Sequence, residues 1–141
     1  MPDTDPLAIA AAWFRHVADR DIDAVMTLAA DEVEVGGARG AGTGRDLLHE
    51  WVDRTRAEIT PTQWFAKDDV AVVEYEAVWR NRAGLDMGRR VMILTFRVED
   101  GRIAGIYRHD DLAASLTLNG LDATDEAEAP GSAAQDAVSR R

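Results

Sequence analysis

Residues 70–109, VAVVEYEAVWRNRAGLDMGRRVMILTFRVEDGRIAGIYRH, decide the fold. Apolar and polar side chains alternate here at the period of two that is typical of β-strands. The Asp100-Gly101 pair separates two of the alternating runs, and Asp-Gly is a strong hairpin signal. The region therefore predicts an antiparallel meander of four strands. With one run that precedes it, the alternating runs are 62–67, 70–80, 89–98 and 102–109.

Helices are predicted before and after this meander in the sequence. Asp5-Pro6 suits the start of a first helix, because aspartate caps well and proline fits the first helical position. A second helix is predicted after Asp21, and a third ends at Thr60-Pro61. A short strand is expected at 32–37, between the second and third helices, and a short helix at 111–120. Helices followed by a meander indicate the α+β class.

Length and composition limit the class of protein. A chain of 141 residues suits one domain, which we place at 1–121. Residues 122–141 hold one large apolar side chain, Val138, so we expect a disordered acidic tail. No apolar run approaches the length of about 18 residues that spans a bilayer. With no cysteine and no signal-peptide pattern at the N-terminus, we expect a cytoplasmic protein.

The formal net charge of −10 argues against nucleic acid as a partner, because phosphates would be repelled on average. The expected partners are a small apolar organic molecule and a second copy of the chain.

The two faces of the predicted sheet differ in composition. We expect the more aromatic face, which carries Tyr75, Trp79 and Phe96, to turn toward the helices. The opposite face would expose an apolar patch, and such patches usually mark interfaces. We therefore expect a homodimer through the outer sheet face. The members of the predicted patch are Val78, Val91, Ile93, Thr95 and Tyr107.

The order and spacing of these elements resemble the nuclear transport factor 2-like superfamily, and its SnoaL-like branch in particular. The resemblance covers residues 7–120, and it rests on the stretches ADRDIDAVMTLAADEVEVGG, GAGTGRDLLHEWV, MILTFRVEDGRI and IYRHDDLAASL. It implies a cone-shaped fold, with three N-terminal helices packed on a curved, mostly antiparallel sheet and a short C-terminal helix. It also implies an apolar pocket for a cyclic, terpenoid-like or polyketide-like ligand, without a cofactor. Members include isomerases, cyclases, hydrolases and non-catalytic binding domains, so the shared fold does not fix the chemistry.

Two catalytic sets known in this superfamily are absent from the matching positions. Where ketosteroid isomerases carry a base aspartate and a tyrosine, this chain has Gly36 and Trp13. Where limonene-epoxide hydrolases carry an arginine and two aspartates, it has Tyr75, Ala77 and Arg108. The polyketide cyclases have an acid on the last strand, in the region that holds Arg108 here.

The catalytic candidates that remain are Glu34, Tyr75, Arg108 and His109. A glutamate could act as a base while an arginine holds an oxyanion, or the two could form a structural ion pair. His109 could be a general base near neutral pH or a residue of the outer face. The residues expected to line the pocket are Trp13, Phe14, Val17, Trp51, Val73, Trp79, Arg90, Met92, Leu94, Phe96 and Ile106.

Other chemistries are disfavoured. His109 and Asp110 are adjacent on a strand and point to opposite faces, so we expect no metal site there. Asp110 and Asp111 instead suit the start of the last helix. The glycine-rich segment 36–44 has Thr43 where a phosphate-binding loop needs lysine. Two hypotheses stay open: a small cofactor-free isomerase, cyclase or hydrolase, and a non-catalytic ligand-binding or dimerisation domain.

Overall fold

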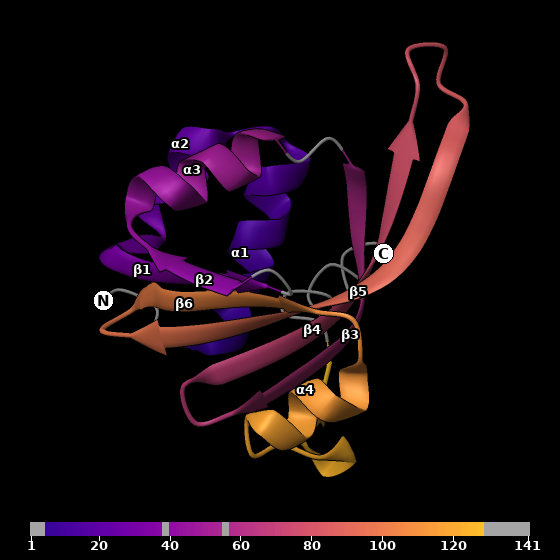
Figure 1. Cartoon of the computed structure of the whole chain (residues 1–141). Coiled ribbons are helices and arrows are strands. Elements are labelled where there is room, and N and C mark those ends of the chain that lie inside the picture. Colours follow the sequence, from indigo (N-terminus) through magenta and orange to yellow (C-terminus); the bar gives the residue numbers. More distant parts are fainter. Residues whose placement is uncertain (1–4, 38–39, 55–56, 129–141) are drawn as a thin grey trace, which may run out of the picture.

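A computed structural model describes residues 5–37, 40–54 and 57–128 of the chain, and it has an α+β architecture (Figure 1). The helices are α1 (Pro6–Ala18), α2 (Ile22–Thr27), α3 (Arg45–Arg54), α4 (Leu112–Leu118) and the 3-10 helix η1 (Ala123–Asp125). The strands are β1 (Ala29–Gly37), β2 (Gly40–Thr43), β3 (Ala57–Lys67), β4 (Val70–Arg80), β5 (Asp86–Glu99), β6 (Arg102–His109) and β7 (Glu126–Ala127).

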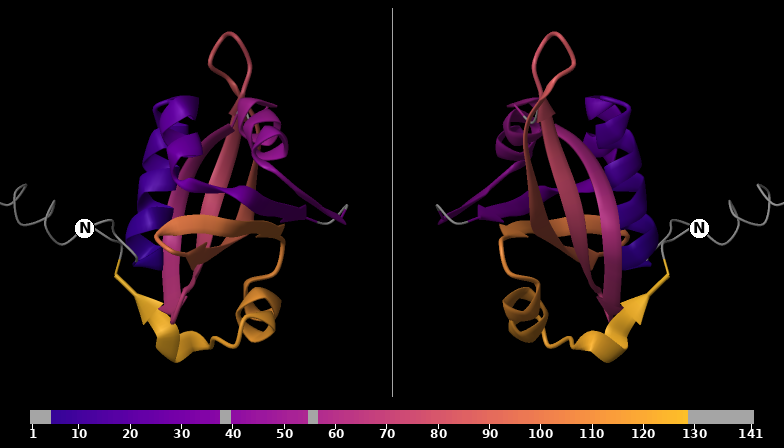
Figure 2. Two further views of the ribbon diagram at one scale, coloured as in Figure 1. Left: turned by 90° about the vertical axis from the view of Figure 1, so that its left-hand side faces the viewer. Right: turned by 90° about the vertical axis from the view of Figure 1, so that its right-hand side faces the viewer.

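The strands form one curved sheet in the order β2-β1-β6-β5-β4-β3-β7. Its pairs are antiparallel except for β1 with β6, which run parallel. The predicted fold class is therefore confirmed. Figure 1 shows α1 and α3 on one side of the sheet and α4 on the other. Figure 2 shows α4 at the end of the molecule opposite the β4–β5 hairpin.

Helix α1 begins where the sequence predicts. The Asp5 carboxylate accepts a hydrogen bond from the Leu7 amide at 3.0 Å, and Pro6 occupies the first helical turn. Asp21 caps α2 in the same way, through the Ala24 amide at 3.1 Å. These side chains satisfy amide groups that have no partner within the helix.

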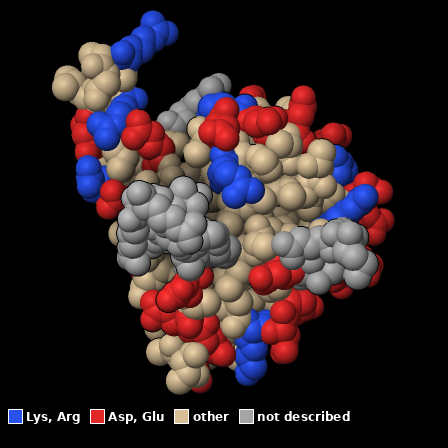
Figure 3. Space-filling model, turned by 180° about the vertical axis from the view of Figure 1, so that it is seen from behind, with Lys and Arg blue, Asp and Glu red and all other residues tan. Residues whose placement is uncertain are grey.

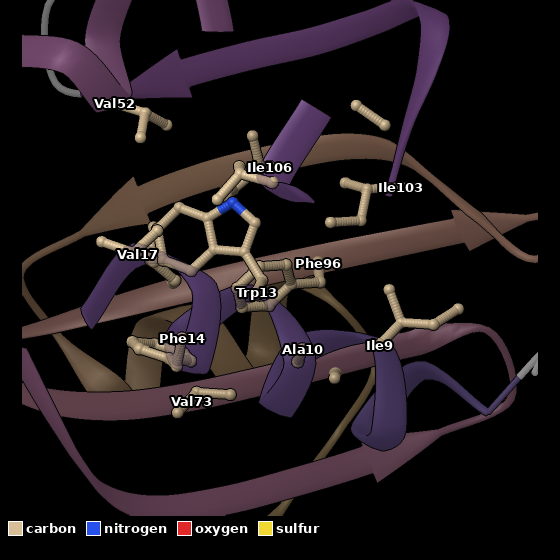
Figure 4. Close-up of a cluster of buried hydrophobic side chains, with 14 of the residues drawn as sticks. Ile9, Ala10, Trp13, Phe14, Val17, Val52, Val73, Phe96, Ile103 and Ile106 are labelled. Carbon is tan, nitrogen blue, oxygen red and sulfur yellow. The ribbon is translucent and has the colours of Figure 1, made fainter. Parts of the chain in front are cut away.

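Helix α1 is held on the sheet by a cluster of aromatic rings (Figure 4). The ring of Trp13 meets Phe14 at 5.2 Å and Phe96 of β5 at 5.5 Å, edge to face. Phe14 meets Tyr75 of β4 at 5.5 Å. Edge-to-face pairs of this kind stabilise a fold beyond the area they bury, by about 0.5–1.5 kcal/mol each.

The alternation along the long strands is confirmed. Strands β4 and β6 have the predicted bounds, and Tyr75 and Phe96 are buried in the cluster beneath α1. Strand β5 is longer than predicted and begins at Asp86. Its hairpin with β4 projects from the body of the molecule, and all residues from 81 to 90 are exposed (Figure 1).

Two predicted boundaries are wrong. Helix α3 ends at Arg54, and Thr60-Pro61 lies inside strand β3 instead of ending the helix. The β3–β4 register shifts between Pro61 and Gln63, and proline is tolerated at such irregular positions near a sheet edge. The expected loop after β1 instead contains β2, which pairs antiparallel with β1.

The outer sheet face is not the exposed patch that the sequence predicted. Residues of α4 and the segment after it cover part of this face in a second apolar cluster, made of Phe65, Val72, Ile93, Leu116 and Leu121. Val78 and Thr95 are also buried, and Tyr107 is partly buried. Of the predicted patch, only Val91 is well exposed, at 54%.

The fold continues past residue 121. Asp122 caps η1 through a capping box with Asp125. Strand β7 then pairs with β3 at Trp64 and Phe65. The remainder of the predicted tail, 129–141, lies outside the described residues. In the described part of the chain, no helix is long and apolar enough to cross a membrane.

The N-cap of α4 predicts that two neighbouring aspartates contribute differently to the free energy of unfolding. The Asp111 carboxylate accepts from the Ala114 amide at 3.0 Å, whereas Asp110 forms an exposed ion pair with Arg90 at 3.6 Å. Asp111→Ala should lower the free energy of unfolding by about 1 kcal/mol, and Asp110→Ala by less than about 0.5 kcal/mol. Urea denaturation at pH 7 measures both losses. Equal losses would contradict the capping role of Asp111.

Candidate ligand-binding cavity

A cavity of about 950 Å³ opens between the helices and the sheet. Helices α1 and α3, the β1–β2 hairpin and strands β3 to β6 all contribute to its wall. Its described lining residues are Trp13, Val35, Gly36, Gly37, Gly40, Ala41, Gly42, Leu47, Trp51, Arg54, Ala57, Ile59, Tyr75, Ala77, Trp79, Met92 and Arg108.

Two stacked indoles form part of the apolar wall. The rings of Trp13 on α1 and Trp51 on α3 lie 5.9 Å apart with an angle of 25° between their planes. Trp13 is buried, while Trp51 and Trp79 are partly exposed. Flat aromatic surfaces of this kind offer a large apolar contact area to a planar ligand.

The buried indole nitrogen of Trp13 lowers the stability of the fold and does not contact a ligand. Among the described residues, Trp13 Nε1 is buried without a hydrogen-bond partner. Figure 4 shows it on the side of the ring that faces Ile106. An unsatisfied buried donor costs about 1–3 kcal/mol. Because this atom is closed off, a ligand in the cavity does not reach it unless the wall moves.

The paired strands β1 and β2 contribute four glycines to the cavity wall, together with Val35 and Ala41. Gly36 and Gly37 end β1, while Gly40 and Gly42 lie in β2. A Cβ at Gly42 would lie 2.5 Å from Cδ2 of Leu47, so glycine allows α3 to approach the hairpin. The close approach of Leu47 therefore accounts for glycine at position 42 without a phosphate ligand.

The polar groups on the wall are few. Burial raises the pKa of Tyr75 to about 12, so its hydroxyl stays protonated at neutral pH. That hydroxyl donates to Met92 Sδ at 3.8 Å, and a thioether is a weak acceptor. The positive charge of Arg108, which lines the same cavity, opposes the rise in the Tyr75 pKa. Arg54 brings a second guanidinium from the end of α3.

A carboxylate stands near this polar end but is paired. Asp110 contributes to the raised pKa of Tyr75, and it forms an ion pair with Arg90. Among the described residues that line the cavity, none is an aspartate, a glutamate or a histidine. The described wall therefore offers hydrogen-bond donors and positive charge, but none of the usual general bases.

Glu34, expected as a base in the pocket, lies on the opposite face of the sheet. Strand β1 pairs with β6 so that Val35 lies beside Ile106 and Glu34 beside Gly105. The Glu34 carboxylate accepts a hydrogen bond of 2.5 Å from the Tyr107 hydroxyl. The alternation of Val33 and Val35 with two glutamates was the sequence signal for this orientation.

Glycine also makes room for the Tyr107 ring on that face. A Cβ at Gly105 would lie 2.5 Å from the Tyr107 hydroxyl oxygen, so only glycine permits the ring to lie over this strand. Burial and the hydrogen bond to Glu34 raise the pKa of Tyr107, while Arg97 lowers it. These three side chains form a polar cluster that is separate from the cavity.

The four catalytic candidates are thus divided between the two faces. Tyr75 and Arg108 share the cavity wall. Glu34 and His109 do not line the cavity, and His109 lies beside Ile93 on the face covered by α4.

The candidates for pocket residues are divided in a similar way. Trp13, Trp51, Trp79 and Met92 line the cavity, whereas Arg90 is exposed beside Asp110. Val17 lines a second, smaller cavity of about 320 Å³. The rest belong to the core and are not among the lining residues: Phe14, Val73, Leu94, Phe96 and Ile106.

Sequence reasoning missed Arg54 and the glycine wall, because both depend on how α3 and the β1–β2 hairpin pack. Metal coordination finds no support in the described residues, where no group of three histidine, aspartate or glutamate side chains could hold an ion.

Solved structures with a similar fold come from several bacteria. A putative polyketide cyclase from Sinorhizobium meliloti has a TM-score of 0.63 and 20% identity, covering 72% of this chain and 94% of its own. A Mycobacterium tuberculosis protein in complex with estradiol-17beta-hemisuccinate has a TM-score of 0.64 and 18% identity, with coverages of 77% and 95%. A hypothetical protein from Catenulispora acidiphila, with a ketosteroid isomerase-like fold and bound trimethylamine, has a TM-score of 0.62 and 22% identity, with coverages of 82% and 95%.

These likenesses support the nuclear transport factor 2-like fold. No curated protein matches the chain. The model of the SnoaL-like domain matches residues 10–106, which is more than half of the chain. This chain therefore belongs to the SnoaL-like domain family.

Proposed function

We propose that this protein binds a cyclic, largely apolar organic molecule in the cavity between α1, α3 and the sheet. The observation that carries the proposal is the cavity itself, about 950 Å³ in volume and walled by three tryptophans with few polar groups. Ligand sites in proteins are concave and mostly apolar, with a small number of polar groups that orient the ligand.

Binding without turnover is the function that the described wall supports best. Acid–base isomerisation, cyclisation or hydrolysis needs a group that takes up a proton. The described lining has Tyr75 and Arg108, which can hold an oxyanion, but no carboxylate or histidine. A cofactor-free isomerase, cyclase or hydrolase is the second candidate, and the presence of Tyr75 and Arg108 in one cavity wall favours it.

Two structural neighbours support a small-molecule ligand. One is in complex with estradiol-17beta-hemisuccinate and another with trimethylamine. At 18% and 22% identity they share the fold with this chain, and the ligand class comes to it only as a proposal. A terpenoid-like or polyketide-like ring system fits a wall of this composition.

We also propose a cytoplasmic homodimer, with a contact that differs from the outer-face patch. Leu85 and Met87 are 64% and 66% exposed on the projecting β4–β5 hairpin, and Val91 follows at its base. Figure 3 shows this hairpin standing away from the body, with basic side chains near its end. A second copy packed along the hairpin would cover these apolar groups.

Filling the cavity should weaken binding without unfolding the protein. Ala57 is partly exposed in the cavity wall and pairs with Trp79, so Ala57→Leu adds methyl groups toward the open space. Fluorescence titration with the neutral probe 1-pyrenebutanol should show at least a ~10-fold loss of affinity, from lost apolar contact. Ala114→Leu on the exposed face of α4 is the control and should bind like the wild type. Failure of the wild type to bind, or equal binding by Ala57→Leu, would contradict the proposed site.

The buried hydroxyl of Tyr75 predicts a loss of stability in alkali. Its pKa is about 12 in the fold and about 10 in an unfolded chain. The folded state therefore holds this proton more tightly, and the stabilisation is complete below pH ~10 and is lost as the pH rises toward 12. Between pH 9 and 11, the free energy of unfolding should fall by about 1–2 kcal/mol more in the wild type than in Tyr75→Phe. Urea denaturation at both pH values measures this, and identical falls would show that Tyr75 is not shifted.

The proposed hairpin contact predicts a dimer that dissociates when charged side chains are introduced into the contact. Leu85→Asp with Met87→Asp places two carboxylates in the proposed contact, where burying them is strongly unfavourable. Light scattering after size-exclusion chromatography should report a dimer for the wild type and a monomer for this variant. Leu118→Asp is the control, because Leu118 is 74% exposed on α4, away from the hairpin. A monomeric wild type, or dissociation only by the control, would refute this contact.

A further inference from the structure

The cavity carries positive charge inside an acidic protein. The chain has a formal net charge of −10, yet the ionisable side chains in the described lining, apart from Tyr75, are the guanidinium groups of Arg54 and Arg108. Arg108 comes from β6 and Arg54 from the last turn of α3, so two distant segments bring like charges to one wall. Both residues are exposed to solvent, and two like charges on one wall attract an anion.

Neighbouring arginines are compensated by the protein itself. Around the β4–β5 hairpin, ion pairs join Arg80 to Glu58 at 3.1 Å, Arg89 to Asp86 at 3.0 Å and Arg90 to Asp110 at 3.6 Å. Within the described residues, neither Arg54 nor Arg108 belongs to any ion pair. In a chain with 26 acidic and 16 basic side chains, carboxylates are not scarce. The described cavity wall therefore lacks carboxylate partners for these two arginines.

The charged groups are arranged beside the apolar surfaces. Arg108 and Tyr75 line the same cavity, from the two strands on either side of β5, and among the described residues the Tyr75 hydroxyl donates to a sulfur acceptor. A guanidinium offers a planar fork of donors that matches the two oxygens of a carboxylate. A tyrosine hydroxyl on the same wall adds one further donor to the same anion. The stacked Trp13 and Trp51 rings belong to the same wall.

We propose that the ligand of this cavity is an organic acid, with a carboxylate held by Arg108 and Tyr75 and a cyclic apolar body against the tryptophans. Arg54 supplies a second positive charge that favours entry of the anion. This inference rests on the proposed small-molecule site and adds the chemical class of its ligand. The competing possibility is that both arginines are merely solvated.

A matched pair of probes tests the charge separately from the apolar body. 1-Pyrenebutyrate and 1-pyrenebutanol share the ring system and chain length, and only the first is ionised at pH 7. The wild type should bind the acid at least ~10-fold more tightly than the alcohol in fluorescence titration. The affinity for the acid should fall as NaCl rises from 50 to 500 mM, while the affinity for the alcohol should not.

Substitution of the arginines identifies which of them produces the preference for the acid probe. Arg108→Met keeps much of the apolar stem and should reduce the preference for the acid, measured as the ratio of the two affinities of the variant, to below ~3-fold. Arg54→Gln should weaken acid binding less and flatten its salt dependence. Arg82→Met, an equal change of charge on the exposed hairpin outside the cavity, should leave the preference intact.

The outcomes separate the two proposals. If the wild type binds both probes equally, the cavity is a ligand site but the organic-acid proposal is overturned. If it binds neither probe, the ligand site fails as well. If Arg108→Met does not fold, two measurements still test the proposal: the salt dependence of acid binding by the wild type, and the preference of Arg54→Gln for the acid. A wild-type affinity for the acid that does not change with salt, together with an unchanged preference in Arg54→Gln, would overturn the proposal.

Discussion

The packing of Trp13 and Phe14 against Phe96 is the contact on which the rest of the structure depends. Phe96 is fully buried at the centre of β5, and both α1 rings meet it at less than 6 Å. This contact holds α1 against the inner face of the sheet at one end. Farther along the same face, Trp13 and Tyr75 have one side in the core and the other on the cavity wall. The geometry of the site is therefore set by the core, and a ligand meets surfaces that are already fixed.

Much of the fold could be predicted from the sequence, because its strongest signals are local. Strands β4 and β6 follow from alternation, and the starts of α1, α2 and α4 follow from Asp5, Asp21 and Asp111. The errors arise where pairing between distant segments overrides a local signal. Pro61 reads as the end of a helix, yet its place in β3 is set by partners on β4. The outer face seemed free because nothing local shows that α4 folds back over Ile93.

The residues of the candidate site also differ in whether a local sequence signal or the packing of distant segments determines their position. Tyr75 and Arg108 lie in long alternating strands, so their face could be predicted once the aromatic side was turned inward. Glu34 lies in β1, which pairs with β6 in parallel, and that pairing sets which of its side chains face the cavity. Arg54 gave no signal, since an arginine at the end of a helix usually complements the helix dipole and is solvated. Only the packing of α3 shows that it also lines a cavity.

The uncompensated arginines also bear on whether this cavity performs chemistry. Tyr75 and Arg108 can stabilise a negative charge, but the described wall has no group suited to create one by removing a proton. On our proposal, the protein therefore selects molecules that arrive already ionised. The net charge of −10 would repel such molecules at long range. At physiological ionic strength, however, charges are screened beyond about 8 Å, so the two guanidinium groups at the cavity decide what enters it. A site of this kind needs a base from its ligand, or from a partner, before it can become an acid–base catalyst.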